Sequence, residues 1–254
     1  MQPFLITPAA GKRLIGMALA AHPAIREALH SGTIVIVAGS TNGYVAEEIL
    51  RSIQQAEGFS KSRFFRGLAL PPKRTTEEGR LPDESGFPGD VVIEKGIWKR
   101  GRSIFDVVDG LDEGDVILKG ANALDLASRQ AAVLIGHFMG GTAIVSLQAS
   151  AGRRVRLLLP VGLEKRISGN LMDLASRLNQ PGRSGLRLLP IPGEIFTEID
   201  AIRLLCGALC EIVAAGGIGG AEGAVWLTLE GSEEEQKRGA ELLEKVQKEK
   251  SFEI

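Results

Sequence analysis

The stretch from Gly32 to Ala38 constrains the fold more than any other part of the chain. Its centre reads Thr-Ile-Val-Ile-Val, a continuous β-branched run that is typical of a strand buried on both faces of a parallel sheet. Two short helices are predicted before it. A glycine-containing loop follows at Gly39–Gly43, and the next residues place Val45, Ile49 and Ile53 on one helical stripe. The segment therefore predicts a strand–loop–helix unit of an α/β protein.

The alternation of strand and helix continues through the rest of the chain. We predict strands at 64–70, 90–99 (or a hairpin turning near 94–96), 116–119, 132–135, 155–161, 186–191 and 224–229. We predict helices after residue 142, at 171–178, at about 194–215, and from a capping box at Ser232 and Glu235 onward. Residues 71–89, rich in proline, glycine and charge, are interpreted as a long loop able to act as a lid. The predicted fold is α/β and Rossmann-like, with a mostly parallel sheet flanked by helices.

Two domain arrangements are compatible with this pattern. Residues 1–191 form the main α/β domain in both. Residues 192–254 either complete the main sheet or form a small helix–strand–helix lobe. The sequence contains no internal repeat that would favour a repeat architecture.

Composition excludes several classes of protein. The 30 Lys and Arg residues balance 31 Asp and Glu residues, which argues against a nucleic-acid-binding protein. The two cysteines, Cys206 and Cys210, are too few for a disulfide scaffold, favour a reducing cytoplasm, and are expected in the core. Residues 131–152 lack charge but contain His137 and a central Gly140–Gly141 pair, so we expect neither a membrane span nor, from the short apolar N-terminal stretch, export.

The loop Gly39–Gly43 is the first candidate for chemistry. Its sequence, Gly-Ser-Thr-Asn-Gly, combines backbone amides that a ligand can approach closely with the polar side chains of Ser40, Thr41 and Asn42. A helix N-terminus that follows favours an anion. The loop has neither the P-loop ending nor the dinucleotide fingerprint. A phosphate or carboxylate is the expected ligand, although a simple strand-to-helix turn has a similar sequence.

The second candidate loop starts at Lys119, directly after a predicted strand. Lys119 can neutralise an anion and Gly120 permits close approach. Asn122 and Asp125 offer an amide and a carboxylate for a polar substrate or proton transfer. Asp125 is equally compatible with capping a helix that starts at Leu126.

Three further features carry weaker signals. His137 suits a general base or a substrate contact, but no ligand partners suggest zinc; a structural histidine at a Gly-Gly-Thr helix entry is the alternative. Glu194 and Glu198 share a face at the predicted start of a helix, where they either stabilise the helix dipole or act as acid and base. The glycine-dense segment Gly216–Gly223 is interpreted as a helix terminator and close-packing connection.

Three segments together resemble a known group of enzymes. They are Gly39–Gly43, the run Asp-Val-Ile-Leu-Lys-Gly-Ala-Asn-Ala-Leu-Asp at 115–125, and Leu-Pro-Ile-Pro at 189–192. They resemble the superfamily of ribose-5-phosphate isomerase, glucosamine-6-phosphate deaminase and CoA-transferases. The resemblance implies that Gly39, Ser40 and Thr41 hold a substrate phosphate and that Lys119 and Gly120 contact the sugar. The isomerases carry an acid where this chain has Asn122.

These observations predict a cytoplasmic enzyme that acts on a small phosphorylated or carboxylated metabolite by isomerisation, deamination or group transfer. Lys119 would orient the substrate, and Asp125 or Glu194 would move a proton. The anion would be held by Gly39, Ser40, Thr41, Asn42 and Gly43, with Gly120, Asn122 and His137 also in contact with substrate. No metal or cofactor is expected, and a homodimer is compatible with the fold. The alternatives are a noncatalytic metabolite sensor, which Asn122 favours, and a CoA-ester transferase.

Overall fold

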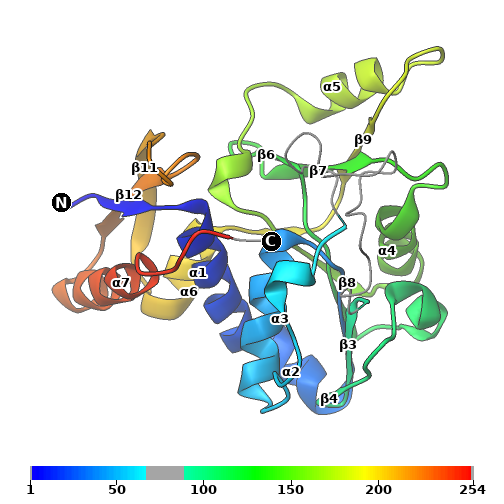
Figure 1. The fold of residues 1–254 in the computed structure, drawn as a ribbon, viewed down its shortest axis with the longest axis horizontal. Helices are drawn as coiled ribbons and strands as arrows, with labels where there is room; N and C mark the ends of the chain where they lie inside the picture. Colours follow the sequence, from blue (N-terminus) through cyan, green and yellow to red (C-terminus); the bar gives the residue numbers. More distant parts are fainter. Residues whose placement is uncertain (1, 67–88, 253–254) are drawn as a thin grey trace.

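The computed structural model, which describes residues 2–66 and 89–252, is built around a six-stranded sheet (Figure 1). The strand order is β10-β8-β5-β2-β3-β4. The strands are β2 (Thr33–Ile36), β3 (Val91–Glu94), β4 (Ile97–Trp98), β5 (Val116–Leu118), β8 (Arg156–Pro160) and β10 (Glu194–Phe196). β10, β8, β5 and β2 run parallel, whereas β3 and β4 form an antiparallel hairpin at one edge. The prediction of an α/β protein with a mostly parallel sheet is confirmed at this level.

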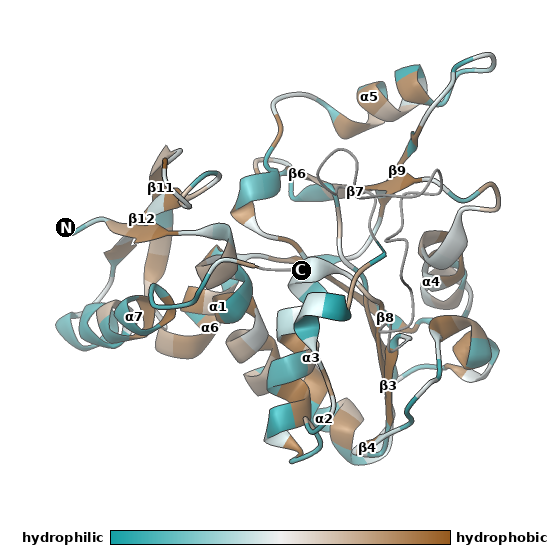
Figure 2. Cartoon of the chain, in the orientation of Figure 1, coloured by the Kyte–Doolittle hydropathy of each residue, from teal (hydrophilic) through white to brown (hydrophobic). Residues whose placement is uncertain are grey.

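The central strands are buried as their sequences predict. Ile34, Val35 and Ile36 of β2 are fully buried, and so are Ile117 and Leu118 of β5. Helices cover both faces of the sheet: α1 (Pro8–Ala21), α2 (Pro23–Ser31), α3 (Ser40–Ser52) and α6 (Glu198–Cys206) lie on one side and α4 (Gly141–Arg153) on the other (Figure 1). Hydrophobic residues follow β3 and β8 in Figure 2, while α7 (Glu233–Val246) is largely hydrophilic.

A separate three-stranded antiparallel sheet corrects one expectation. It consists of β6 (Ala123–Asp125), β7 (Gln130–Ile135) and β9 (Arg187–Ile191), covered by α5 (Leu171–Leu178). We expected residues 132–135 and 186–191 to continue the alternation of the main sheet. The connection between β6 and β7 is too short for a parallel crossover, so these strands pair as a hairpin, and the helix expected from Leu126 is replaced by its turn.

The C-terminal part contains a third sheet and a second correction. Its strands are β1 (Phe4–Ile6), β12 (Val225–Glu230) and β11 (Leu209–Ala215), in that order. The helix expected over 194–215 is wrong, because this segment contains β10, α6 and β11. Thr197 and Asp200 form a capping box that starts α6, and Gly207, in the left-handed region at φ 82°, ends it. Residues 216–223 therefore connect two antiparallel strands rather than a helix and a strand.

Several other expectations can be compared with the described ranges. The two N-terminal helices, the hairpin near 94–96 and the Ser232–Glu235 capping box are confirmed. Residues 64–66 are not in a strand; the rest of that expected strand, and the expected lid over 71–88, lie outside the described residues. Short 3-10 helices occur in connections: η1 (Lys61–Arg63), η2 (Ile104–Asp106), η3 (Val108–Gly110) and η4 (Leu163–Lys165). Within the described ranges, no helix has the length and apolar character needed to cross a membrane.

A buried arginine joins the two ends of the chain. Arg13 of α1, which is 8% exposed, donates to Glu47 and Glu48 of α3 and to Glu249 beyond α7. Its guanidinium also lies over the ring of Tyr44, 4.9 Å from the centroid. This network fixes α1, α3 and the C-terminal segment against one another. The N-terminal strand β1 also pairs with β12 of the C-terminal sheet. Residues 194–196, which belong to the expected C-terminal part, form strand β10 of the main sheet.

Candidate functional site

The candidate site lies where the carboxyl ends of β2, β5 and β8 meet. Because these three strands are parallel neighbours, the segments that leave them emerge at the same edge of the sheet. β2 leads into Gly39 and α3, β5 leads into Lys119 and Gly120, and β8 leads into η4. An added Cβ at Gly39 or at Gly120 would meet no atom of the described residues within 4 Å, so none of these residues fills the space next to either backbone position.

No side chain of the residues that the structure describes caps the N-terminus of α3. Gly39 is the N-cap residue, it offers no side chain, and the first turn contains no acidic residue. The first amides of a helix have no intrahelical acceptor and carry the positive end of its dipole. An anion is the ligand that this terminus favours.

Asn42, although it belongs to the predicted anion loop, has a structural role. Its side chain is fully buried, and its Nδ2 donates to the carbonyl oxygens of Val37 at 2.8 Å and Leu118 at 2.9 Å. These bonds tie the carboxyl ends of β2 and β5 together. Asn42 thus aligns the loops that form the site.

Lys165 is a site residue that the sequence analysis did not select. It follows β8 on η4, and its Nζ lies 3.4 Å from Oγ1 of Thr41, which is itself 1% exposed. Burial lowers the pKa of Lys165, while Glu164 raises it and Lys12 lowers it further. A lysine shortly after a strand end, as at Lys119, was the signal available in the sequence.

Lys119 lies in the same cluster, partly buried at the end of β5. Its Nζ donates to the carbonyl oxygen of Gly120 at 3.4 Å, a long hydrogen bond. No carboxylate of the described ranges forms an ion pair with it. Burial lowers the pKa of Lys119 to about 8, and the charges of Arg66 and Lys165 lower it too, against the opposing effect of Asp90.

Asp90 holds Arg66, the third cation of the cluster, in place. Its carboxylate is completely buried and accepts from Nη2 of Arg66 at 2.8 Å and from the backbone amides of Ala38 and Ile104, each at 2.9 Å. One side chain thus fixes both Arg66 and the segment that leaves β2. Sequence reasoning missed this pair because Asp90 and Arg66 are brought together only by the tertiary fold.

Two carboxyl groups, Glu164 and Glu198, adjoin the cationic cluster. Glu198, at the first position of α6, is 2% exposed and accepts from the backbone amide of Leu163 at 3.0 Å. Within the described part of the chain neither oxygen of Glu164 has a hydrogen-bond partner, and Lys12 Nζ lies 3.9 Å away. Burial raises the pKa of Glu198, and the neighbouring Glu164 raises it further.

Glycines make room for both carboxyl groups. A Cβ at Gly11 would overlap Oε1 of Glu198, and a Cβ at Gly162 would overlap Oε2 of Glu164. Real Cβ atoms do not approach so closely, so any other residue at these positions would displace the carboxyl groups. The arrangement provides a buried carboxyl that can hold a proton near neutral pH, next to Lys165 and Lys12.

The structure places Asp125 and Asn122 in the β6–β7 hairpin. Asp125 accepts from the amides of Ala127 and Ser128 and from the Ser128 hydroxyl, and these bonds from Ser128 lower its pKa. Oδ1 of Asn122 accepts from the amide of Leu134 at 3.0 Å. Both side chains therefore have structural partners, and Asp125 caps a turn in place of the expected helix.

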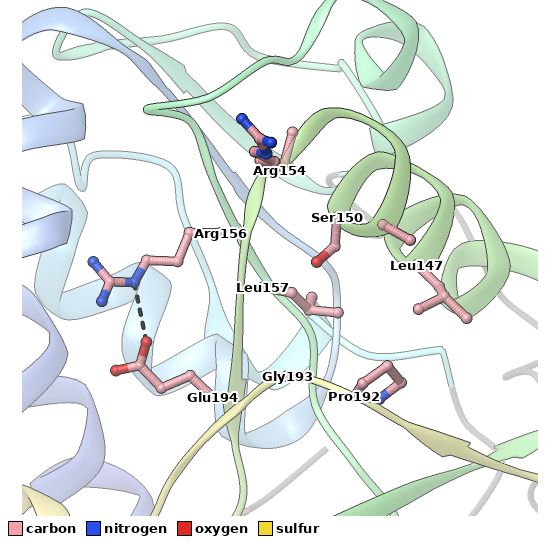
Figure 3. Close-up of a pocket in the computed structure, with 10 residues that line it drawn as sticks. Leu147, Ser150, Arg154, Arg156, Leu157, Pro192, Gly193 and Glu194 are labelled. Carbon is pink, nitrogen blue, oxygen red and sulfur yellow. Dashed lines mark hydrogen bonds and ion pairs between the residues drawn. The ribbon is translucent and has the colours of Figure 1, made fainter.

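Glu194 and His137 are held away from this cluster. Glu194 accepts from Nε of Arg156 at 3.0 Å beside a shallow pocket (Figure 3). Arg156 begins β8, so this ion pair lies toward the end of the strand opposite to η4. His137 is exposed on the loop before α4, where its Nδ1 accepts from the amide of Met139 and its ring stacks on Phe138.

Comparisons with protein-family models, with curated proteins and with solved structures give no match to this chain. The described residues contain no group of three or more His, Cys, Asp or Glu side chains arranged to hold a metal. The site itself is therefore the basis for a functional conclusion. It combines cations and a helix N-terminus with a buried carboxyl pair.

Proposed function

We propose that this protein binds a small phosphorylated or carboxylated metabolite at the carboxyl edge of its main sheet and acts on it as an enzyme. The observation that carries the proposal is the contact of Lys165 with Thr41 in the first turn of α3, whose N-terminus has no side-chain cap among the described residues, together with Lys119 at the end of the neighbouring strand β5. The positive charges of Arg66 and Lys165 lower the pKa of Lys119, and an anion bound beside these groups would offset that repulsion. A phosphate dianion relieves this repulsion more than a carboxylate does.

The buried carboxyl pair favours proton-transfer chemistry at this site, as in isomerisation or deamination. A general acid or base works best with a pKa near the working pH, and burial moves the pKa of Glu198 in that direction. We therefore assign the proton-transfer role to Glu198 with Glu164 in place of Asp125 or Glu194, whose carboxylates are engaged with Ser128 and Arg156.

A noncatalytic sensor is the second candidate. Asn122 stands where the resembling isomerases carry an acid, and here it serves the β6–β7 hairpin. A sensor would bind the anion without turning it over. The proposed relationship to the isomerase and CoA-transferase superfamily is supported by the loop sequence after β2 and by the parallel arrangement of β2, β5, β8 and β10. The buried, unpaired Cys206 and Cys210 support a reducing, cytoplasmic compartment.

The test is calorimetric titration with inorganic phosphate, ribose 5-phosphate and acetate, at constant ionic strength. The expected order is phosphate compounds tighter than acetate. Lys119→Gln and Lys165→Gln should each weaken binding roughly 10- to 100-fold, the range for loss of a charge-assisted hydrogen bond. Lys237→Gln, on the exposed surface of α7, is the matched control. Equal weakening by all three variants would refute a site at the sheet edge. Turnover of a bound ligand would separate the enzyme from the sensor.

A further inference from the structure

The environment of Lys119 differs from that of the other lysines in the cluster. Lys165 donates to Thr41, and Lys12 lies 3.9 Å from Glu164. The nearby Glu164 and Glu198 raise the pKa of Lys165 against the effect of burial. For Lys119, burial lowers the pKa, and the charges of two cations, Arg66 and Lys165, lower it further. Among the described residues, Lys119 is thus a desolvated lysine at a strand end that forms no ion pair with a carboxylate.

The carboxylate that opposes the lowering of the Lys119 pKa, Asp90, already has other hydrogen-bond partners. Asp90 raises the pKa of Lys119, but its two oxygens accept from the amides of Ala38 and Ile104 and from Arg66. Its charge is thus shared among three donors. A partly desolvated lysine beside other cations is the arrangement that generates a nucleophilic amine at neutral pH.

The position of Lys119 in the sheet would also let a substrate reach its amine. Lys119 stands at the carboxyl end of a parallel strand, where substrates bind in open α/β sheets, and no atom of the described residues fills the space next to Gly120. The anion-binding groups Lys165, Thr41 and the α3 N-terminus lie in the same cluster. A substrate whose phosphate occupies these groups would present its other functional groups to Lys119.

We propose that Lys119 forms an imine with the carbonyl carbon of a phosphorylated aldehyde or ketone, an inference that rests on the proposed function. The neutral Nζ attacks the carbonyl carbon, and a proton moves from nitrogen to oxygen to give a carbinolamine. Loss of the hydroxyl group and the remaining N–H proton as water then leaves the C=N bond. No oxidant or reductant takes part. The protonated imine withdraws electrons from the adjacent carbon, which prepares a C–H or C–C bond for cleavage.

The experiment is reductive trapping on the whole chain. The protein is incubated with glyceraldehyde 3-phosphate and cyanoborohydride, and the modified peptides are identified by mass spectrometry. We expect Lys119 to be labelled at least 10-fold faster than the exposed Lys237. We also expect inorganic phosphate to protect it and unphosphorylated glyceraldehyde to label it more slowly. Lys119→Arg, which keeps the charge but cannot form an imine, should lose the fast labelling, whereas Lys237→Arg should keep it.

The outcomes separate this inference from the proposed function. If glyceraldehyde 3-phosphate raises the melting temperature but labels Lys119 no faster than Lys237, the imine is refuted and anion binding stands. If glyceraldehyde 3-phosphate neither raises the melting temperature nor is displaced by phosphate, both the imine and the proposed anion site are refuted. Mapping the labelled lysines on the protein without substitutions tests the imine even if Lys119→Arg fails to fold.

Discussion

The ammonium of Lys165 lies 3.4 Å from the hydroxyl oxygen of Thr41, although 124 residues separate them in the chain. The contact joins the segment after β8 to the first turn of α3. It forms because β5 alone separates β2 from β8, so that both strands deliver polar side chains to one edge. Four predictions follow from this edge and the core that supports it.

Anion binding should weaken as the pH rises above about 8. Burial lowers the pKa of Lys119 to about 8, so the free site loses a positive charge through this range. Lys119→Arg keeps its charge and should bind phosphate with a flatter pH profile, the remaining decline belonging to Lys165. Calorimetric titrations from pH 6.5 to 9.5 measure both. Identical profiles would show that Lys119 does not contact the anion.

Asp90→Asn should destabilise the protein by about 2–4 kcal/mol, because a buried charged partner of Arg66 is replaced by a neutral amide. The same change should weaken phosphate binding, since Arg66 and the Ala38 segment lose their anchor. Urea unfolding and phosphate titration give the two values. Asp109→Asn, at an exposed position in η3, serves as control. A stability equal to that of the control variant would contradict the role of Asp90.

Glu198→Gln should change how stability depends on pH. Burial raises the folded-state pKa of Glu198, so from about pH 5 upward the native state holds a proton that the unfolded state has lost. This group's contribution to stability is therefore present at low pH and falls as pH rises. Removing it should make the slope of the unfolding free energy more positive by up to about 1.4 kcal/mol per pH unit. Parallel curves from pH 5 to 7 would show that Glu198 is ionised in the native protein.

Arg13→Met should cost about 3–5 kcal/mol, because it leaves the carboxylates of Glu47, Glu48 and Glu249 close together without their common partner. Lowering the pH should recover part of the loss as carboxylates take up protons. Chemical denaturation at pH 7 and pH 5 measures both effects. Arg51→Met removes an exposed cation that contacts Glu47 and Glu48, and it should cost less than 1 kcal/mol.

Local sequence patterns predicted the strands and helices whose signals are self-contained. The β-branched run of β2, the amphipathic α5 and the capping box of α7 form as expected. Which strands pair with one another was harder to predict from the sequence. β7 and β9 have sequences typical of central strands, yet they pair with each other, because strand pairing depends on connection length and packing. The helix expected after Glu194 failed because the left-handed Gly207 ends α6 early and a separate strand follows.

Part of the site was accessible to the same reasoning. Lys119 directly follows β5 and Thr41 lies in the polar loop Gly39–Gly43, so their positions were predictable. Lys165 lies five residues beyond β8 in a segment without such a loop, and Arg66 and Asp90 meet only through tertiary contacts that no local spacing encodes. Glu198 was considered as an acid or base, but its contact with the Leu163 amide was not predicted. Asp125 and Glu194 were selected for their residue type, but nearby Ser128 and Arg156 engage them.

The pairing of β1 with β12, together with the bond between Arg13 and Glu249 across 236 residues, has a consequence for biosynthesis. The ribosome makes β1 and α1 well before it makes β12 and Glu249. The strand Phe4–Ile6 and the buried guanidinium of Arg13 therefore stay without these native partners until residues 225–249 have left the ribosome. The nascent chain carries an unpaired strand edge through the synthesis of all the residues between them, and the arrival of residues 225–249 completes the pairing.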